Sequence, residues 1–591
     1  MSQSIRMSQF VTTYGPGAIL ESADGPRIIP SGDIGLFGNG NLNLRPERFE
    51  ISDQRMSAGL LNGSRIFRLP SNAELSLPDA YYIYRTKAFP IWSLCVARHR
   101  GDLSVLYRGS SCPVCGAAAG RFKEAIRFIV ACPSGHMDEV NWRLLVHGGD
   151  IACQHDSWFA WKGGGGSLNR VTVKCPGCGK ERNLGEAYGT NWHCSGRSPE
   201  REATDSPGLR PGCERKAKII QRQASNLRIP ELSTLFTIPP RTTPLHNLLQ
   251  IQEIRTAFAV AGAPDSKAAL EALLKRLVDG AILGPQIARS ILAYSWQEIG
   301  TALADVQAPI SSNYGDLLHD EFAALVDASD HGYPRSGTEG YAFEVNPALV
   351  FRYAMSARMV FKVAAVSRLR TVTVQRGFRR EVDSRQRSLV VSSGFQDSAQ
   401  PLRAWYPGVE FLGEGIFVTF DGPDALAGAQ DGAAFRAWSQ VAPSAYPPEV
   451  FRTQQKDELS PVFIWWHTLS HLLMRAVSVE AGYSASSIRE RVYLGRTGDR
   501  PSAGILLYAT QSGTEGTLGG LTALVSTFND YLSTALSFAG SCSSDPLCGD
   551  SVVQAGRTQG AACYACCLVS ETSCEHRNMW LDRNIVREAG P

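Results

Sequence analysis

Fourteen of the fifteen cysteines gather in two parts of this 591-residue chain, and they constrain its fold more than any other feature. Eight lie between residues 101 and 220, and six lie between residues 542 and 574. The first residues contain no apolar signal segment, and no uninterrupted apolar stretch reaches the roughly 18 residues of a membrane helix, so we expect a cytoplasmic protein. Disulfides are rare in that compartment. Clustered thiols there favour zinc, which takes four thiolate or imidazole ligands, often supplied as close pairs.

The first group joins two such pairs. Cys112-Pro-Val-Cys115 is followed sixteen residues later by Cys132-Pro-Ser-Gly-His136. Both pairs contain the proline or glycine that tight ligand-bearing turns favour. We predict one structural zinc ion on these four residues.

The second group begins with Cys175-Pro-Gly-Cys178 and is completed by two single residues, Cys194 and Cys213. The wide spacing of the last two leaves other ligands open, and the substitutes are His193 and Cys153. Outside such a role, we interpret the nearby residues as ordinary core or loop positions, namely Cys95, Cys153 and His155.

The third group lies near the C-terminus. Its four predicted ligands are Cys542, Cys548, Cys563 and Cys566. Cys567 and Cys574 are close by, and Cys574 is an alternative to Cys542. An iron–sulfur cluster is a second interpretation of so many thiols. Across the chain we predict about three structural zinc ions and no iron.

The motifs of common enzymes are missing from the sequence. It contains neither the phosphate-binding pattern G-x4-G-K-[ST] nor the nucleophile pattern G-x-S-x-G. His467 and His471 have the spacing of H-E-x-x-H but lack its glutamate, so we expect two buried, hydrogen-bonded histidines. Zinc sites with four cysteine or histidine ligands are closed, and their binding energy goes into folding. We therefore expect no catalytic residue and no enzyme activity.

A local excess of arginine is the one nucleic-acid signal in a chain whose net charge is only +3. Arginine binds two phosphate oxygens with its planar fork, and Phe378 lies within the stretch as a residue able to stack on a base. An equally open interpretation is a solvated strand face. The candidate DNA-binding residues are Arg368, Arg370, Arg376, Arg379 and Arg380.

The pattern along the chain predicts a mixed α/β, multi-domain protein. Apolar residues recur at three- and four-residue steps in parts of 246–327, which predicts helices, and residues 465–482 read as a buried helix ending at Gly482. Strands are expected at 366–378, 415–420 and 500–510. The domains we expect are an N-terminal region at 1–100, two zinc-binding lobes at 101–220, a helical middle region with linkers at 221–345 and a zinc-binding domain at 346–591.

Three C-terminal segments carry a resemblance to a known family. They are WWHTLSHLLMRAVSVEAGYSASSIRERVY at 465–493, GILLYATQSGTEGTLGGL at 504–521 and GAACYACCLVSETSCEHRNMWLDR at 560–583. They resemble the zinc-binding helicase-associated domain at the C-terminus of MrfA-type superfamily 2 helicases. That family's four-cysteine cluster maps onto Cys542, Cys548, Cys563 and Cys566. The additional Cys567 and Cys574 depart from its pattern.

The chain lacks a helicase motor, and its opening SQFVTTYGPGAIL and its segment RFIVACPSGHMDEVNW are similar to the DrmB family of the DISARM anti-phage system. The resemblance implies a complex with a DrmA-like helicase ATPase that acts on foreign DNA. We therefore expect a non-catalytic, zinc-containing, DNA-binding partner subunit. The alternatives are a nuclease with an unrecognised site and an assembly scaffold without DNA contact.

Overall fold

The computed structural model of the chain forms two compact units, each of which is described by itself. Unit 1 consists of residues 1–52, 64–234 and 373–409, and unit 2 consists of residues 53–63, 235–372 and 410–591. The residues that the structure describes are 5–31, 49–78, 84–97, 99, 103–117, 122–150, 152–163, 166–202, 212–238, 244–249, 251–307, 310–334, 342–356, 358–382, 388–396, 404–421, 426, 431–445, 460–484, 486–497, 500–511, 520–554 and 559–589.

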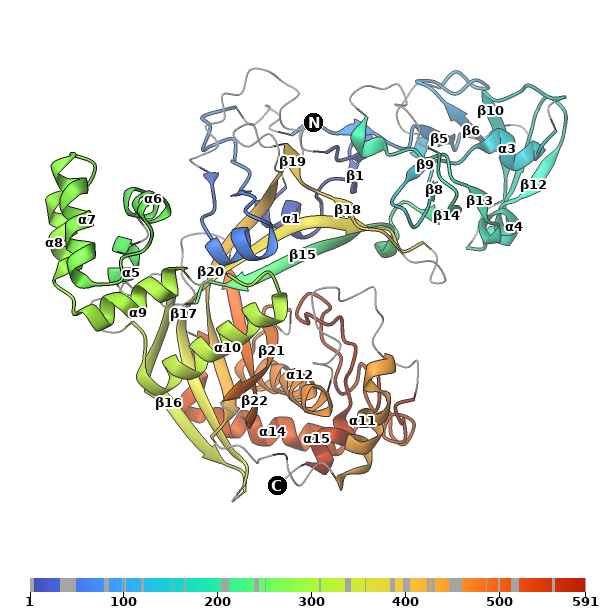
Figure 1. Cartoon of the computed structure of the whole chain (residues 1–591). Coiled ribbons are helices and arrows are strands. Elements are labelled where there is room, and N and C mark those ends of the chain that lie inside the picture. The colour runs from blue at the N-terminus through green and yellow to red at the C-terminus, as the bar shows by residue number, and fades with distance from the viewer. Residues whose placement is uncertain are drawn as a thin grey trace. The chain divides into compact units, whose positions relative to one another are not determined.

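Unit 1 contains three small antiparallel sheets (Figure 1). The first has the order β1 (Ile19–Ser22), β2 (Gly25–Ile28) and β4 (Lys87–Ala88). The second has the order β12 (Glu181–Asn183), β11 (Thr172–Lys174), β10 (Trp158–Lys162), β6 (Ser104–Arg108), β5 (Trp92–Cys95) and β7 (Lys123–Ala125). The third has the order β13 (Trp192–His193), β14 (Lys216–Gln221), β8 (Phe128–Ala131) and β9 (Met137–Glu139).

Short helices complete unit 1. They are α1 (Met7–Thr12), α3 (Trp142–His147), α4 (Leu184–Gly189) and the helical turns η3 (Leu168–Arg170), η4 (Pro199–Arg201) and η5 (Ser225–Leu227). Helix α3 begins where the side chain of Asn141 accepts a hydrogen bond from the amide of Leu144. Its Trp142 packs edge to face against Trp161 of β10 in an aromatic core. Elements this short bury little apolar surface, so the unit needs further cross-links.

One long sheet has strands with residues in both units. Its order is β15 (Ile229–Phe236), β17 (Val360–Arg379), β20 (Ala404–Phe420), β22 (Arg500–Gln511) and β21 (Arg489–Thr497). Shorter pairings add β16 (Phe343–Ala354) and β18 (Val391–Ser392) to β17, and β3 (Ile66–Phe67) and β19 (Phe395–Gln396) to β20. The strands expected at 366–378, 415–420 and 500–510 are confirmed, each as part of a longer strand.

In unit 2 this sheet is covered on both faces. Ile505 joins the core under α12 (Pro461–Ala481), whereas its neighbour Leu506 joins the core under α10 (Tyr314–His331). Successive side chains of a strand point to opposite faces, so a strand buried on both sides reads as a continuous apolar run. Helix α12 is also confirmed: it ends at Gly482, which has a left-handed φ of 73°.

The remaining helices of unit 2 form two groups. Around α12 lie α11 (Ala433–Ala445), α14 (Phe528–Gly540) and α15 (Arg583–Glu588), with α13 (Gly520–Ala523) and the turn η8 (Leu524–Thr527) nearby. The expected helices of the middle region are confirmed as α5 (Pro244–Leu249), α6 (Gln252–Ala261), α7 (Lys267–Asp279), α8 (Pro285–Leu292) and α9 (Trp296–Gln307), which share a core of their own. The short helix η2 (Arg55–Leu60) also belongs to this unit.

The expected mixed α/β class is therefore confirmed, and the described residues form several sheets with Cys-rich candidate metal clusters. No helix within the described ranges combines the length and the apolar character that a membrane crossing requires. The glycine-rich part of the family-like segment, residues 512–519, lies outside the described residues.

Candidate metal centres

Cysteine and histidine side chains converge in four groups that each contain at least three cysteines, and in every group the four donor atoms lie within 4.8 Å of one another. Cluster 1 is Cys95, His99, Cys112 and Cys115. Cluster 2 is Cys132, His136, Cys194 and Cys213. Cluster 3 is His147, Cys153, Cys175 and Cys178. Cluster 4 is Cys542, Cys548, Cys563 and Cys566.

Cluster 1 forms where strand β5 ends. Cys95 is the last residue of β5 and pairs with Val105 of β6 and Lys123 of β7, the strands on either side of the Cys112–Cys115 turn. The Sγ atoms of Cys95 and Cys115 are 3.8 Å apart. His99 places Nδ1 3.0 Å from the carbonyl oxygen of Leu103, so Nδ1–H donates there and Nε2 faces the thiols.

Cluster 2 is assembled by the third sheet of unit 1. The register pairs Ala131 of β8 with Lys218 of β14, and His193 of β13 with Lys216 of β14. Cys132 and Cys194 directly follow Ala131 and His193, so the sheet brings them together. The Nδ1 atom of His136 lies 3.5 Å from Cys132 Sγ and 3.6 Å from Cys194 Sγ.

Cluster 3 combines a hairpin turn with a helix end. Cys175 follows β11, and its amide donates to the carbonyl oxygen of Lys180, which closes the turn into β12. His147 is the last residue of α3, and its Nε2 lies 3.3 Å from Cys178 Sγ while its Nδ1 lies 3.0 Å from the carbonyl oxygen of Arg143. The Sγ atoms of Cys153 and Cys175 are 3.8 Å apart.

Cluster 4 follows helix α14. The Sγ atoms of Cys542 and Cys563 are 3.5 Å apart, and those of Cys548 and Cys566 are 3.7 Å apart. The amide of Cys563 also donates to Cys566 Sγ at 3.2 Å. Arg583 donates to Asp545, which lies between the first two cysteines and accepts from the amide of Cys542. These contacts hold the lobe against α15.

The geometry fits zinc. A tetrahedron with Zn–S bonds of about 2.3 Å places its sulfur atoms about 3.8 Å apart. The sulfur–sulfur distances quoted above are 3.5 to 3.8 Å. Ring nitrogens that donate their other N–H to a backbone carbonyl are oriented as metal ligands are. Four protein ligands leave no open position, so these sites suit a structural ion.

Two of the turns also stabilise the deprotonated form of one exposed thiol each, Cys115 and Cys178. The backbone N–H of Ala117 lowers the pKa of Cys115 to about 7, and the backbone N–H of Lys180 lowers the pKa of Cys178 to about 7. Because zinc binds the thiolate, a turn that favours the deprotonated sulfur also favours the metal.

The predicted ligands all lie in these clusters, but the predicted pairing of the N-terminal ones is wrong. Cys112 and Cys115 do not join Cys132 and His136, and Cys175 and Cys178 do not join Cys194 and Cys213. Cluster 2 takes its ligands from both predicted groups. The reason is the strand pairing, which places each close pair beside residues from neighbouring strands instead of the next pair in sequence.

Three ligands were missing from the sequence prediction, namely Cys95, His99 and His147, whereas Cys153, considered there as a substitute, does join Cys175 and Cys178 in cluster 3. Cys95 and His99 have the same C-x3-H spacing as Cys132 and His136, and that repeat was the available signal. The sequence carries no comparable signal for His147, whose role depends on the end of α3. His193, considered as a substitute ligand, lies outside the clusters, and its Nδ1 contacts the carbonyl oxygen of Cys194.

The two additional C-terminal thiols do not belong to cluster 4. Cys567 is buried next to it, and its carbonyl oxygen faces His471. Cys574 lies 3.2 Å from the Nε2 atom of His467. The four cysteines mapped from the MrfA-type pattern thus remain a complete set.

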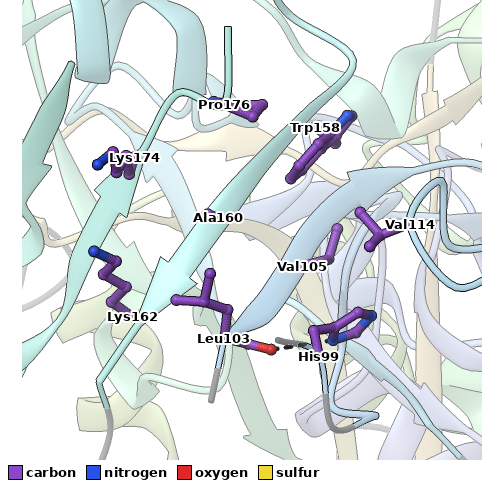
Figure 2. A pocket seen from close by; sticks show the side chains of 9 residues that line it. All are labelled: His99, Leu103, Val105, Val114, Trp158, Ala160, Lys162, Lys174 and Pro176. Carbon is purple, nitrogen blue, oxygen red and sulfur yellow. Dashed lines mark hydrogen bonds between the residues drawn. The ribbon is translucent and has the colours of Figure 1, made fainter. Parts of the chain in front are cut away.

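A cavity of about 310 Å³ lies between clusters 1 and 3 (Figure 2). Its lining includes the ligand His99 and the turn residues Val114 and Pro176. Lys162 of β10 and Lys174 of β11 lie on one side and Trp158 on the other, as Figure 2 shows. Neither lysine forms an ion pair with another residue that the structure describes.

Most arginine side chains of the predicted DNA-binding strand contact other groups of the protein. Arg379 is 3% exposed and pairs with Glu231, and Arg380 is fully buried and donates to the carbonyl oxygen of Gly135. Phe378 is also fully buried, with Arg380 over its ring. In this structure these three side chains are not at a surface that DNA can reach, which corrects their assignment.

Two of the other predicted DNA-binding arginines are partly buried. Arg370 donates to Glu410 and Thr237, and Arg376 is also only partly accessible. Arg368 is the one with an exposed side chain among the five. DNA contact by these residues remains a prediction.

Two family models match the chain. Residues 6–229 match a domain of unknown function (DUF8724), which includes clusters 1, 2 and 3. Residues 469–567 match the MrfA Zn-binding domain, which includes the four cysteines of cluster 4. The chain therefore carries an MrfA-type zinc-binding domain near its C-terminus.

A curated relative and a solved structure complete the comparison. The chain is 27% identical to DISARM protein DrmB of Bacillus paralicheniformis (strain ATCC 9945a / NCIMB 11709 / CD-2), over 81% of this chain and 82% of the relative. The crystal structure of the DUF1998 helicase MrfA bound to DNA matches with 10% identity and a TM-score of 0.18, over 35% of this chain and 22% of that one. The resemblance to DrmB and to the MrfA zinc-binding domain is confirmed by the family and sequence matches.

Double substitutions distinguish the observed pairing of ligands from the one expected from sequence. We expect Cys95→Ser with Cys112→Ser to lower the zinc content by one ion per chain, because both residues serve cluster 1. Cys112→Ser with Cys132→Ser should lower it by two, because those residues serve different clusters. Elemental analysis of the purified full chain measures both. Equal losses for the two pairs would show that the clusters are assigned incorrectly.

Replacing a ligand of cluster 4 should unfold its lobe locally. Cys563→Ser should lose one ion per chain and raise hydrogen exchange between residues 542 and 566, because a closed site contributes folding energy. Cys567→Ala, which removes a neighbouring buried thiol outside the cluster, is the matched control and should keep its zinc. Unchanged zinc and exchange in the Cys563 variant would contradict the assignment.

Proposed function

We propose that this chain, a relative of DISARM protein DrmB, is a non-catalytic zinc-containing partner of a helicase-like ATPase in antiviral defence. The observation that carries the proposal is the MrfA Zn-binding domain at 469–567 in a sequence without a phosphate-binding loop. The solved MrfA protein is a helicase bound to DNA. A domain of that type without its own motor has a role if the motor is supplied by a second chain.

The metal centres support a binding role for this chain. Each of clusters 1 to 4 presents four protein ligands, so a bound zinc ion has no free position for a substrate or a reactive water. Such ions stabilise small lobes and hold their loops in fixed conformations. Rigid loops of this kind suit contacts with a partner chain or with nucleic acid.

A nuclease is the main competing proposal, and one pair of carboxylates that could bind magnesium is occupied by an arginine instead. Glu321 and Glu575 both contact Arg491, with N–O distances of 2.8 and 2.6 Å. The guanidinium therefore occupies the position that a shared magnesium ion would need. We assign this group to the stability of unit 2.

Contact with DNA is the second part of the proposal, and the lysine-flanked cavity of unit 1 is its best candidate. Lys162 and Lys174 lie on adjacent strands, and Ala160 pairs with Lys174 in the β10–β11 register, so both lysines project from the same face. Trp158 lies on that face too, at the other side of the cavity. Basic side chains beside an aromatic ring are the usual elements of a single-strand site.

Association with a motor protein is directly testable. We expect the full chain, co-expressed with a DrmA-like helicase ATPase, to co-purify with that partner at a fixed ratio. We expect the chain alone to show no ATP turnover, because its sequence has no phosphate-binding loop. ATP hydrolysis that follows the isolated chain through every purification step would refute the non-catalytic role, and failure to associate would favour a separate function.

The lysines can be tested by the salt dependence of DNA binding. Lys162→Ala with Lys174→Ala should reduce the slope of log affinity against log salt on single-stranded DNA by about 1.4, since each phosphate contact contributes about 0.7. The control is Lys275→Ala with Arg276→Ala, which removes the same charge from an exposed face of α7. An equal change in both double variants would show a general charge effect. No change in either would remove this cavity from the DNA-binding surface.

A further inference from the structure

We propose that unit 2 contains a fifth metal site, of a donor type different from clusters 1 to 4, that holds a divalent zinc-class ion. Its ligands are His467, His471, Glu490 and Cys574, whose donor atoms lie within 4.8 Å of one another. From sequence, the two histidines were expected to be buried and hydrogen-bonded, and they are. What the sequence did not show is that a carboxylate and a thiol converge on the same point.

The four ligands come from three separate elements. His467 and His471 are one helical turn apart on α12 and therefore share a face of that helix. Glu490 comes from strand β21, and Cys574 comes from the segment between cluster 4 and α15. The two histidines and Glu490 are 0% exposed, and Cys574 is 5% exposed. Polar groups buried this completely require compensation at their centre.

Backbone contacts orient both histidines with Nε2 toward the centre. His467 Nδ1 lies 3.2 Å from the carbonyl oxygen of Trp580, and His471 Nδ1 lies 2.8 Å from the carbonyl oxygen of Cys567. A carbonyl only accepts, so each Nδ1 carries the hydrogen and donates it. The Nε2 lone pair of each neutral ring then points inward, which is the arrangement found around metal-bound histidines.

Hydrogen bonds also position the other two ligands. Glu490 receives a hydrogen bond from the hydroxyl of Ser470 on its Oε2, which leaves Oε1 facing the histidines. Cys574 Sγ accepts hydrogen bonds from the backbone amides of His576 and Asn578, both at 3.3 Å. These two amide contacts fix the position of the sulfur beside the histidines.

Donor and acceptor counting then favours a cation at the centre. The two Nε2 atoms and Oε1 are all acceptors, and Oε1 lies 2.9 Å from Nε2 of His467 and 3.4 Å from Nε2 of His471. With both rings neutral, the single hydrogen that Cys574 could offer cannot satisfy three converging acceptors, whereas one metal ion contacts all of them at once. Two neutral imidazoles, one carboxylate and one thiolate carry a charge of about −2, which one divalent ion neutralises.

The distances suit a small tetrahedral ion. Bonds of about 2.0–2.1 Å to nitrogen and oxygen correspond to edges of about 3.3–3.4 Å, and a sulfur ligand lengthens its edges slightly. The measured edges from Nε2 of His467 are 2.9 Å to Oε1 of Glu490 and 3.2 Å to Cys574 Sγ. A mixed nitrogen, oxygen and sulfur set of this size favours zinc over calcium or magnesium, which prefer oxygen alone.

The proposed ion would connect parts of the chain that the family match does not span. The MrfA Zn-binding match covers residues 469–567, so His467 and Cys574 lie outside it at either end. An ion here would fasten the C-terminal segment to α12 and β21. With four protein ligands it has no open position, so we assign it a structural role.

Metal stoichiometry of the full-length chain tests the site. We expect Cys574→Ala and Glu490→Gln each to lower the zinc content by one ion per chain relative to the unmodified protein. Glu490→Gln keeps the size of the side chain and can still accept from Ser470. The control is His331→Gln, which changes an exposed histidine on α10 and should keep the full metal content. Circular dichroism reports whether each variant remains folded.

Every outcome decides the proposal. A loss of one ion in a folded Cys574 or Glu490 variant supports it, and unchanged zinc in both overturns it. If both variants fail to fold, the unmodified chain decides: clusters 1 to 4 account for four ions, so five zinc ions per chain support the fifth site and four or fewer overturn it. Replacement by cobalt gives a further readout, because a one-thiolate site absorbs differently from the sulfur-rich clusters.

Discussion

A zinc ion binds only where four donor atoms meet at one point, and unit 1 depends on that requirement at three places. Its strands are short: β14 has six residues and β13 only two. Sheets of this size bury too little apolar surface to be stable alone. Each cluster lies where strands of one sheet end, so a bound ion fixes strand ends that hydrogen bonds leave weakly held. The metal centres and the strand registers therefore support each other.

Unit 2 has a different balance of forces. Its sheet is long, buried on both faces and packed against α10 and α12, so apolar burial supplies much of its stability. The ligands of cluster 4 and the proposed ligand Cys574 lie in the C-terminal segment between α14 and α15, where the described residues have little regular structure. Cluster 4 and the proposed fifth site both lie along that segment. This arrangement predicts that metal removal affects the segment locally, whereas in unit 1 it affects whole sheets.

The sequence predicted the ligand types, the helix α12 and the strands of the long sheet, because each depends on local spacing or periodicity. Ligand pairing could not be predicted, since it depends on which strands become neighbours; cluster 2 required the β13–β14–β8 register. The prediction that Arg379 and Arg380 contact DNA was wrong for a similar reason. Charge in the sequence suggested a surface, whereas Arg380 is fully buried among backbone carbonyls and lies 3.5 Å from Glu200. Burial is a property of the tertiary fold.

The histidine pair on α12 shows how a missing residue in a motif can mislead. In H-E-x-x-H the glutamate beside the first histidine acts as a base, and its absence here argued against a metal. In this chain a carboxylate does reach the histidines, but it comes from β21 and faces them as a fourth ligand. A carboxylate that completes the coordination cannot also activate a metal-bound water, since no position for that water remains. The four residues that complete the proposed site therefore leave no position for a hydrolytic water, which is why we assign the site a structural role.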